Sequence, residues 1–168
     1  MTSSDIGVRD TTIYCSSMVR ALWPSPLAEQ WAALYPDLFD AEDVRLTRTQ
    51  PKNHFAEWFA AIHLFQRDGL LSLVEKYLFK GHPRKQTLLN RLLTPGQQSA
   101  LREISDQCGV QPPDLLVYSS GLSAVGFAEV KGPGDRLREA QRVSHRAIEH
   151  RLELPVEMIV VRIVGAAT

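Results

Sequence analysis

Cysteine is scarce in this chain: Cys15 and Cys108 are the only two, and neither belongs to a Cys-x-x-Cys or zinc-ligand pattern. A disulfide scaffold is thereby excluded, and a reducing cytoplasm is the expected compartment. No run approaches the roughly 18 apolar residues of a membrane span, and the start, MTSSDIGVRD, lacks the pattern of a signal segment. We therefore expect a cytoplasmic protein with no membrane partner, while secretion by a specialised route stays open.

Neither sign of charge predominates, since 19 Lys and Arg balance 19 Asp and Glu. The distribution is uneven, however: the first fifty residues carry four basic and seven acidic side chains, and the next fifty carry seven and three. Nucleic-acid binding depends on the local field, so a zero net charge does not exclude it. The length of 168 residues and the hydrophobic content of 44% are typical of one globular domain.

The most informative stretch is residues 113–141, PDLLVYSSGLSAVGFAEVKGPGDRLREAQ. Two apolar runs on either side of a Ser-Ser-Gly turn predict a β-hairpin. Side-chain alternation places Glu129 and Lys131 on one face of the second strand, and Asp114 at the head of the first can approach them. Two carboxylates that converge in a cleft bind a hard cation such as Mg²⁺. The pattern indicates a phosphodiester-cleaving site in outline, whereas Glu-x-Lys alone is usually a solvated ion pair.

A helix is predicted directly after this hairpin. Gly132-Pro133-Gly134 ends the strand, and Asp135 is placed to cap a helix with apolar residues from Leu137 to Ile148. Gln141 projects from the core-facing side of that helix. Because a buried amide needs a partner, we expect Gln141 to face the cleft at the strand end.

This stretch resembles the VRR-Nuc (virus-type replication-repair nuclease) module of the PD-(D/E)xK superfamily. The resemblance covers under a fifth of the chain, and EVKGPGDRL is its most specific part. It implies a catalytic set of Asp114, Glu129, Lys131 and Gln141. It also implies that Asp114, Glu129 and the carbonyl of Val130 hold Mg²⁺ or Mn²⁺, and that products carry 5′-phosphate and 3′-hydroxyl ends.

Residues 53–68 predict a helix that is apolar nearly all round and therefore buried. Glu57 lies inside it, and a buried carboxylate needs a cation or several donors. An ion pair with a Lys or Arg is one explanation. The resemblance offers another, because PD-(D/E)xK enzymes often carry a Glu on the helix before the sheet that reaches the metal. Both explanations stay open for Glu57.

Basic residues gather around a Gly and a Pro after residues 70–80, which have helical spacing but could form a strand. A loop of this composition is suited to nonspecific contact with phosphates, although a solvated charge run is an equal alternative. The arginines of the helix after the hairpin could flank DNA in the same way. The candidate DNA-binding residues are Lys80, His82, Arg84, Lys85 and Arg136.

The remaining signals complete the predicted order of elements. Residues 1–24 are polar and predict an arm, and Ser25-Pro26 begins a helix. Thr94 and Gln97 match a capping box for a helix that ends at Gly109. Residues 158–164 predict a buried strand beside the strand of Glu129.

We therefore predict an α/β fold with a restriction-endonuclease-like core, a mixed sheet flanked by helices, over residues 51–168. Residues 1–50 are predicted to add an arm and a helical extension to this single compact domain. The expected function is metal-dependent cleavage of DNA, branched or nicked, in repair, recombination or replication, by a monomer or a homodimer. The alternatives are a toxin nuclease held by a protein inhibitor and a catalytically silent DNA- or protein-binding module.

Overall fold

The fold is built on one five-stranded sheet with the strand order β1-β5-β4-β3-β2. The computed structural model describes residues 10–78 and 81–165. Strands β1 and β4 both run parallel to β5, whereas β3 is antiparallel to β4 and to β2. This arrangement confirms the predicted α/β class with a mixed sheet flanked by helices. The strands are β1 (Asp10–Ser16), β2 (Leu71–Val74), β3 (Leu115–Tyr118), β4 (Ala124–Lys131) and β5 (Val156–Val164).

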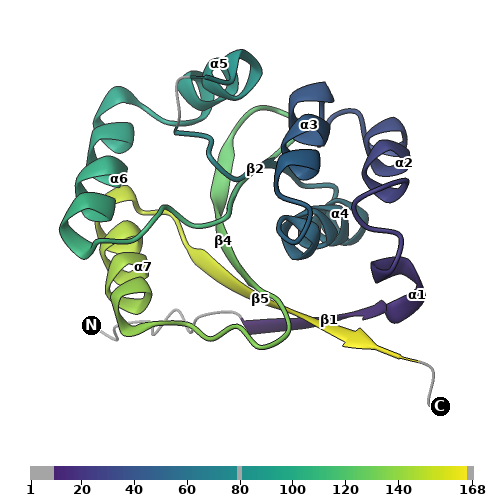
Figure 1. Ribbon diagram of the computed structural model, residues 1–168. Helices are drawn as coiled ribbons and strands as arrows, with labels where there is room; N and C mark the ends of the chain where they lie inside the picture. The colour runs from purple at the N-terminus through teal and green to yellow at the C-terminus, as the bar shows by residue number, and fades with distance from the viewer. Residues whose placement is uncertain (1–9, 79–80, 166–168) are drawn as a thin grey trace.

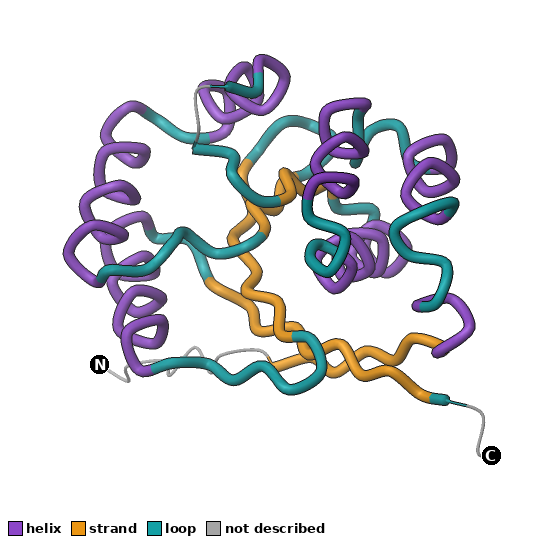
Figure 2. The backbone as a smooth tube through the Cα atoms, viewed as in Figure 1, coloured by secondary structure: helices purple, strands orange, loops and turns teal. Residues whose placement is uncertain are grey.

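Helices cover both faces of the sheet, with α1 to α4 on one side and α5 to α7 on the other (Figure 1). The tube in Figure 2 shows the strands running between these two groups. The helices are α1 (Ser17–Arg20), α2 (Leu27–Leu34), α3 (Ala41–Thr49), α4 (Phe55–Asp68), α5 (Pro83–Leu92), α6 (Pro95–Cys108) and α7 (Glu139–Leu152).

Alternation along the strands divides the core into two halves. Ala128 and Val130 pack among α2 and α4, whereas Phe127 packs among α5, α6 and α7. Burial of a larger side chain such as Val130 or Phe127 contributes about 1.5–3 kcal/mol. Aromatic rings fill the first half, where Phe39 stacks on Trp58 with ring centroids 3.8 Å apart. These aromatic side chains therefore belong to the core.

The predicted hairpin and its neighbour are both present. Leu115 pairs with Ala128 and Tyr118 with Ala124, so β3 and β4 are antiparallel with a short turn between them. Residues 158–164 lie within β5, which pairs beside β4. The capping box of Thr94 and Gln97 is confirmed as well, and Gly109, at φ 66°, ends α6.

One prediction of local structure was wrong. The predicted arm contains β1, whose residues 10–16 pair with β5 along their full length. Only Ile13 and Cys15 of this edge strand are buried, so its apolar pattern is weak. Helix and strand were both open for residues 70–80, and residues 71–74 form the strand β2, because pairing with β3 decides the conformation of a short apolar run.

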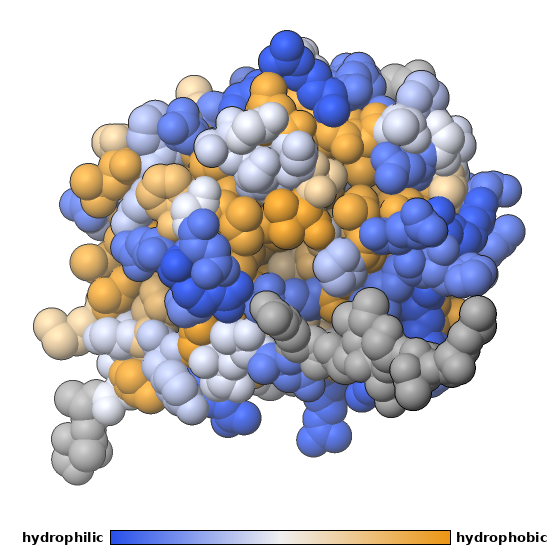
Figure 3. Space-filling model, turned by 180° about the vertical axis from the view of Figure 1, so that it is seen from behind, coloured by the Kyte–Doolittle hydropathy of each residue, from blue (hydrophilic) through white to orange (hydrophobic). Residues whose placement is uncertain are grey.

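The surface has mixed polarity. The face opposite to that of Figure 1 has hydrophobic residues in a central band between hydrophilic ones (Figure 3). Within the described residues, no helix is long and apolar enough to cross a lipid bilayer. The most exposed large apolar side chains of the described residues are Tyr14, Leu34 and Met18.

Candidate active site

Acidic side chains gather at one edge of the sheet, where β2 and β4 end and β3 begins. Glu75 directly follows β2, Asp114 directly precedes β3, and Glu129 lies near the end of β4. Because β3 is antiparallel to both neighbours, these three positions meet at the same edge. Glu57 reaches the edge from the first turn of α4.

Three of these carboxylates form a tight group. One oxygen each from Glu57, Glu75 and Asp114 lies within 4.8 Å of the others. Among the described residues, no Lys, Arg or His pairs with Glu57 or Asp114 at ion-pair distance. Carboxylates this close repel one another unless they are protonated or share a cation. Oxygen ligands at this spacing suit a hard divalent ion.

The pKa values of this group reflect the crowding. Burial raises the pKa of Asp114 well above its usual range, and the charges of Glu129 and Glu57 raise it further. A hydrogen bond from the Val130 N–H to Asp114 Oδ2, at 2.8 Å, only partly opposes this. Burial, followed by the charge of Glu75, raises the pKa of Glu57 to about 7. Without a cation, the group therefore retains protons near neutral pH.

Glu75 was missed by sequence reasoning. Its backbone is left-handed at φ 45°, as is that of Lys76 at φ 50°, and this turn directs the carboxylate toward Asp114. The Glu75 N–H donates to the Asp114 carbonyl at 2.8 Å, and Lys85 Nζ donates to the Glu75 carbonyl at 3.1 Å. An acidic residue directly after a short apolar run was the available signal, but the helical interpretation of residues 70–80 obscured it.

His54 holds the Glu75 carboxylate from the other side. Its Nδ1 forms an ion pair with Glu75 Oε2, and its Nε2 lies 3.0 Å from Gln50 Oε1. The residue is 8% exposed and has left-handed backbone at φ 74° immediately before α4. His54 thus contacts the candidate site directly.

Glu129, Lys131 and Gln141 form a second, hydrogen-bonded group. Glu129 is 5% exposed, and its Oε1 accepts from Gln141 Nε2 at 2.8 Å and lies 3.1 Å from Lys131 Nζ. Lys131 Nζ also donates to Gln141 Oε1 at 3.2 Å. The Val130 N–H links Asp114 to the same strand, so the structure brings all four predicted catalytic side chains together.

His145 also faces Glu129, and sequence reasoning did not select it. Its Nε2 lies 3.7 Å from Glu129 Oε2. His145 follows Gln141 by four residues on α7, so both project from the same face of the helix. The i, i+4 spacing was the signal that could have found it.

The role predicted for Asp135 was wrong. Helix α7 begins at Glu139 with Arg138 as its N-cap, three residues later than the expected cap at Asp135. Asp135 Oδ2 instead accepts from the Gly132 N–H at 3.2 Å, within a turn that contains Gly134 at φ 81°. Gln141 takes part in the capping, because its Oε1 accepts from the Arg138 N–H at 3.0 Å.

The predicted phosphate-binding loop is not an exposed loop. Pro83 begins α5, and Lys85 is 1% exposed with its Nζ 2.7 Å from Asp43 Oδ1. His82 is buried, and Arg84 donates to the Asp37 carbonyl at 2.8 Å. The prediction is wrong for these three residues because the acidic start of α3 draws them inward. Lys80 lies outside the described residues, and the exposed Arg136 stays a candidate for DNA contact.

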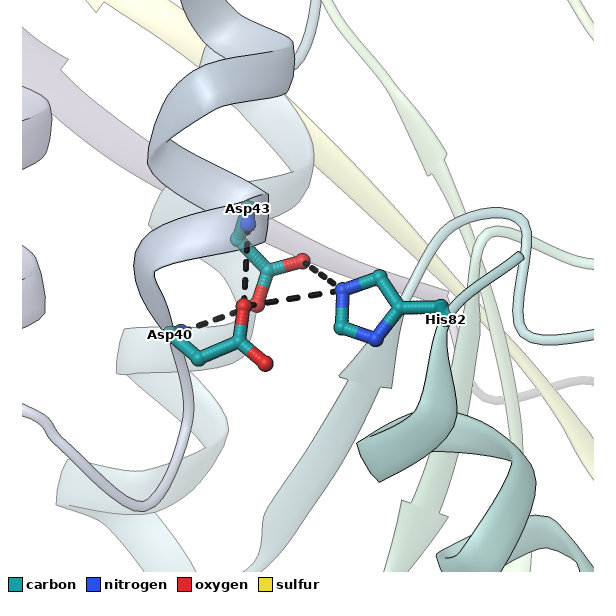
Figure 4. A group of neighbouring side chains, drawn as sticks. All are labelled: Asp40, Asp43 and His82. Atoms are coloured by element: carbon teal, nitrogen blue, oxygen red, sulfur yellow. Dashed lines mark hydrogen bonds and ion pairs between the residues drawn. The ribbon is translucent and has the colours of Figure 1, made fainter.

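Asp40, Asp43 and His82 also satisfy the spacing of a metal site, and Figure 4 shows their side chains turned toward one another. His82 Nε2 lies 3.5 Å from Asp40 Oδ1 and 3.7 Å from Asp43 Oδ1. The two aspartates already accept from each other's backbone N–H groups, at 3.0 and 2.9 Å. The Lys85 ammonium supplies the cation. This group therefore connects α3 to α5.

No protein-family model matches this chain, and neither does any curated protein. The assignment to a family consequently rests on the residues and their arrangement.

Proposed function

We propose that the chain is a metal-dependent DNA nuclease of the VRR-Nuc type with a restriction-endonuclease-like core. The observation that carries this proposal is the convergence of Glu57, Glu75 and Asp114 within 4.8 Å beside Lys131 and Gln141. A half-buried cluster of acids next to a lysine is a donor set suited to phosphodiester hydrolysis with a divalent cation.

The side chains fit Mg²⁺ or Mn²⁺. These half-buried carboxyls with raised pKa values are held together at an energetic cost that a divalent cation removes. Glu57, Glu75 and Asp114 would hold the ion, while the roles of Glu129 and the Val130 carbonyl as ligands stay predictions. When bound, the ion lowers the pKa of a water molecule and neutralises charge at the scissile phosphate.

The second group supplies orientation and positive charge. Gln141 binds Glu129 through its amide nitrogen and Lys131 through its amide oxygen, so it fixes both side chains. The Lys131 ammonium is a compact charge that suits a phosphate oxygen as charge develops there. An arginine at this position would carry the same charge in a wider planar group. We therefore expect the Lys131→Arg variant to be inactive.

A panel of DNA substrates tests the proposal. Purified protein with Mn²⁺ is incubated with linear duplex, flap, four-way junction and plasmid DNA. We expect cleavage of at least one substrate, with 5′-phosphate ends, and its loss in EDTA or in Glu129→Gln and Lys131→Ala variants. Asp68→Asn is the matched control, because Asp68 lies on α4 about 16 Å along the helix from Glu57. Activity that persists in EDTA, or that Lys131→Ala leaves unchanged, would rule the proposal out.

A further inference from the structure

A pocket of about 810 Å³ opens directly beside the carboxylate group. Its walls are the turn after β2, the C-terminal half of α6 and the segment that leads into β3. Glu75 and Asp114 belong to both the pocket and the carboxylate group. The volume lies within the roughly 300–1,000 Å³ of ordinary ligand sites. Any molecule that enters the pocket therefore lies against the proposed metal ligands.

The pocket wall is mostly apolar surface, and it also carries two cationic side chains and the three carboxyls of Glu75, Asp106 and Asp114. Val110 is 7% exposed and Tyr77 is 2% exposed, and the Tyr77 hydroxyl donates to the Pro113 carbonyl at 2.7 Å, which joins two of the walls. The Ser105 hydroxyl is buried and has no hydrogen-bond partner among the described residues. The side chains of Lys76 and Arg102 are exposed and line the same pocket.

The turn after β2 contributes one residue to the carboxylate group and the next residue to the pocket. Glu75 and Lys76 each have left-handed backbone, which is unfavourable for residues other than glycine and which persists where surrounding contacts impose it. The contacts here are the Lys85 ammonium on the Val74 carbonyl, at 2.5 Å, and the Glu75 N–H on the Asp114 carbonyl. The turn directs Glu75 toward the carboxylates and leaves Lys76 exposed at the pocket.

We propose that this pocket binds one unpaired nucleotide of the DNA, adjacent to the scissile phosphate. An apolar wall accepts the face of a base, and cations at the rim accept the backbone phosphate. A base inside a duplex is stacked and paired, so it cannot enter a pocket of this kind. The inference rests on the proposed nuclease function and specifies its substrate as DNA with a single-stranded segment at the cleavage point.

Binding to matched DNAs tests the pocket. Fluorescence anisotropy in EDTA gives Kd for a duplex and for the same duplex with a single-stranded flap. We expect Lys76→Ala/Arg102→Ala to raise the Kd of the flap DNA at least about fivefold, because both cations contact the backbone of the flap, and that of the duplex under about twofold. Arg91→Ala, an exposed arginine on α5 outside the pocket, is the matched control.

An abasic probe isolates the base itself. Gln111 is exposed and lines the pocket, so Gln111→Trp should fill the space with little effect on folding. Removal of the bases from the flap should weaken binding to wild type, yet not weaken binding to Gln111→Trp any further. The pocket assignment would be overturned if the Lys76→Ala/Arg102→Ala variant lost equal affinity for flap and duplex DNA while it still cleaved with Mn²⁺. It would also be overturned if removal of the bases weakened binding equally in wild type and in Gln111→Trp. A wild type that neither cleaves nor binds DNA would overturn the nuclease function and the pocket with it.

Discussion

Two groups of acidic side chains lie in this protein at metal-ligand spacing, and their charge balance differs. Asp40 and Asp43 face cations, because Lys85 Nζ lies 2.7 Å from Asp43 and Arg84 Nη1 lies 3.8 Å from both aspartates. Glu57, Glu75 and Asp114 share only His54 among the described residues, through its ion pair with Glu75. The first group has cations at ion-pair distance from both aspartates, whereas the second has more carboxyls than cationic partners among the described residues.

This difference separates a structural cluster from a binding site. Each oxygen of Asp43 already has a partner, Lys85 for one and the Asp40 N–H for the other. The pKa of Asp40 is low: burial acts to raise it, but the Asp43 N–H and the charges of His82 and Arg84 outweigh burial. Burial also raises the pKa of Asp43, but the charge of Lys85 opposes this. Burial raises the pKa values of Glu57 and Asp114 as well, and there the neighbouring carboxylates add to the effect of burial. Spacing alone does not distinguish the two groups, but the presence of an internal cation does.

The largest expected effect follows from loss of a ligand in the uncompensated group. Asp114→Asn should lower the cleavage rate by at least about a thousandfold, because water activation by the cation contributes several kcal/mol. It should leave the metal-free protein at least as stable as wild type, since one of the mutually repelling carboxylates is gone. Cleavage assays with Mn²⁺ and melting curves in EDTA measure both effects. A thousandfold loss accompanied by unfolding would instead make Asp114 a structural residue.

The opposite behaviour is expected in the neutralised group. Lys85→Met leaves Asp43 buried without its cation and should reduce stability by about 3–5 kcal/mol. The melting temperature should fall by roughly 6–20 °C. The double variant Asp43→Leu/Lys85→Met should recover much of this loss, while Lys52→Met, at an exposed lysine, is the control and should change little. A double variant no more stable than the single one would show that Lys85 acts mainly through the Val74 and Glu75 carbonyls.

The pH dependence of stability should distinguish the groups as well. The pKa of Glu57 is raised from 4.5 to about 7 in the folded protein, so the folded state binds more protons than the unfolded state between these values. Stability of the metal-free protein should therefore fall as pH rises from 4.5 to about 7, by roughly 3 kcal/mol at most. Denaturant titrations across this range, with and without Mn²⁺, measure the fall.

Glu57→Gln and Mn²⁺ should each remove that pH dependence. The amide keeps the shape of the side chain without a proton to lose, and a bound cation stabilises the ionised form. Isothermal titration should show weaker Mn²⁺ binding by the variant. Unchanged Mn²⁺ affinity together with a large fall in melting temperature would place Glu57 in the core rather than in the site.

The smallest expected effect concerns the cap of α3. Asp40→Ala removes a side chain that accepts from the Asp43 N–H and should reduce stability by about 1 kcal/mol. Thr94→Ala is a matched comparison, since Thr94 forms the same capping box on α6 without a neighbouring histidine or arginine at ion-pair distance. Thermal unfolding of both variants measures the difference. If Asp40→Ala reduces stability no more than Thr94→Ala does, the contacts of Asp40 with His82 and Arg84 add nothing to stability.

The features that depend on local pattern could be predicted from the sequence. Alternation predicted the hairpin that brings Asp114 to Glu129 and Lys131, and helical spacing predicted that Gln141 projects toward them. The capping box at Thr94 and the buried helix of Glu57 could also be predicted, because both follow from local sequence pattern. Each of these signals lies within about fifteen residues of the feature it specifies.

The contacts between residues distant in sequence, and the charges that cancel through them, follow from the three-dimensional arrangement of the chain. Glu75 joins the site because a left-handed turn after β2 is held by Asp114 and Lys85, and no local pattern encodes that contact. Lys85 turns inward because α3, forty residues earlier, places Asp43 against it. The polar strand β1 forms because β5, at the far end of the chain, offers it an edge. The free energy of pairs distant in sequence depends on three-dimensional proximity, which a linear pattern does not contain.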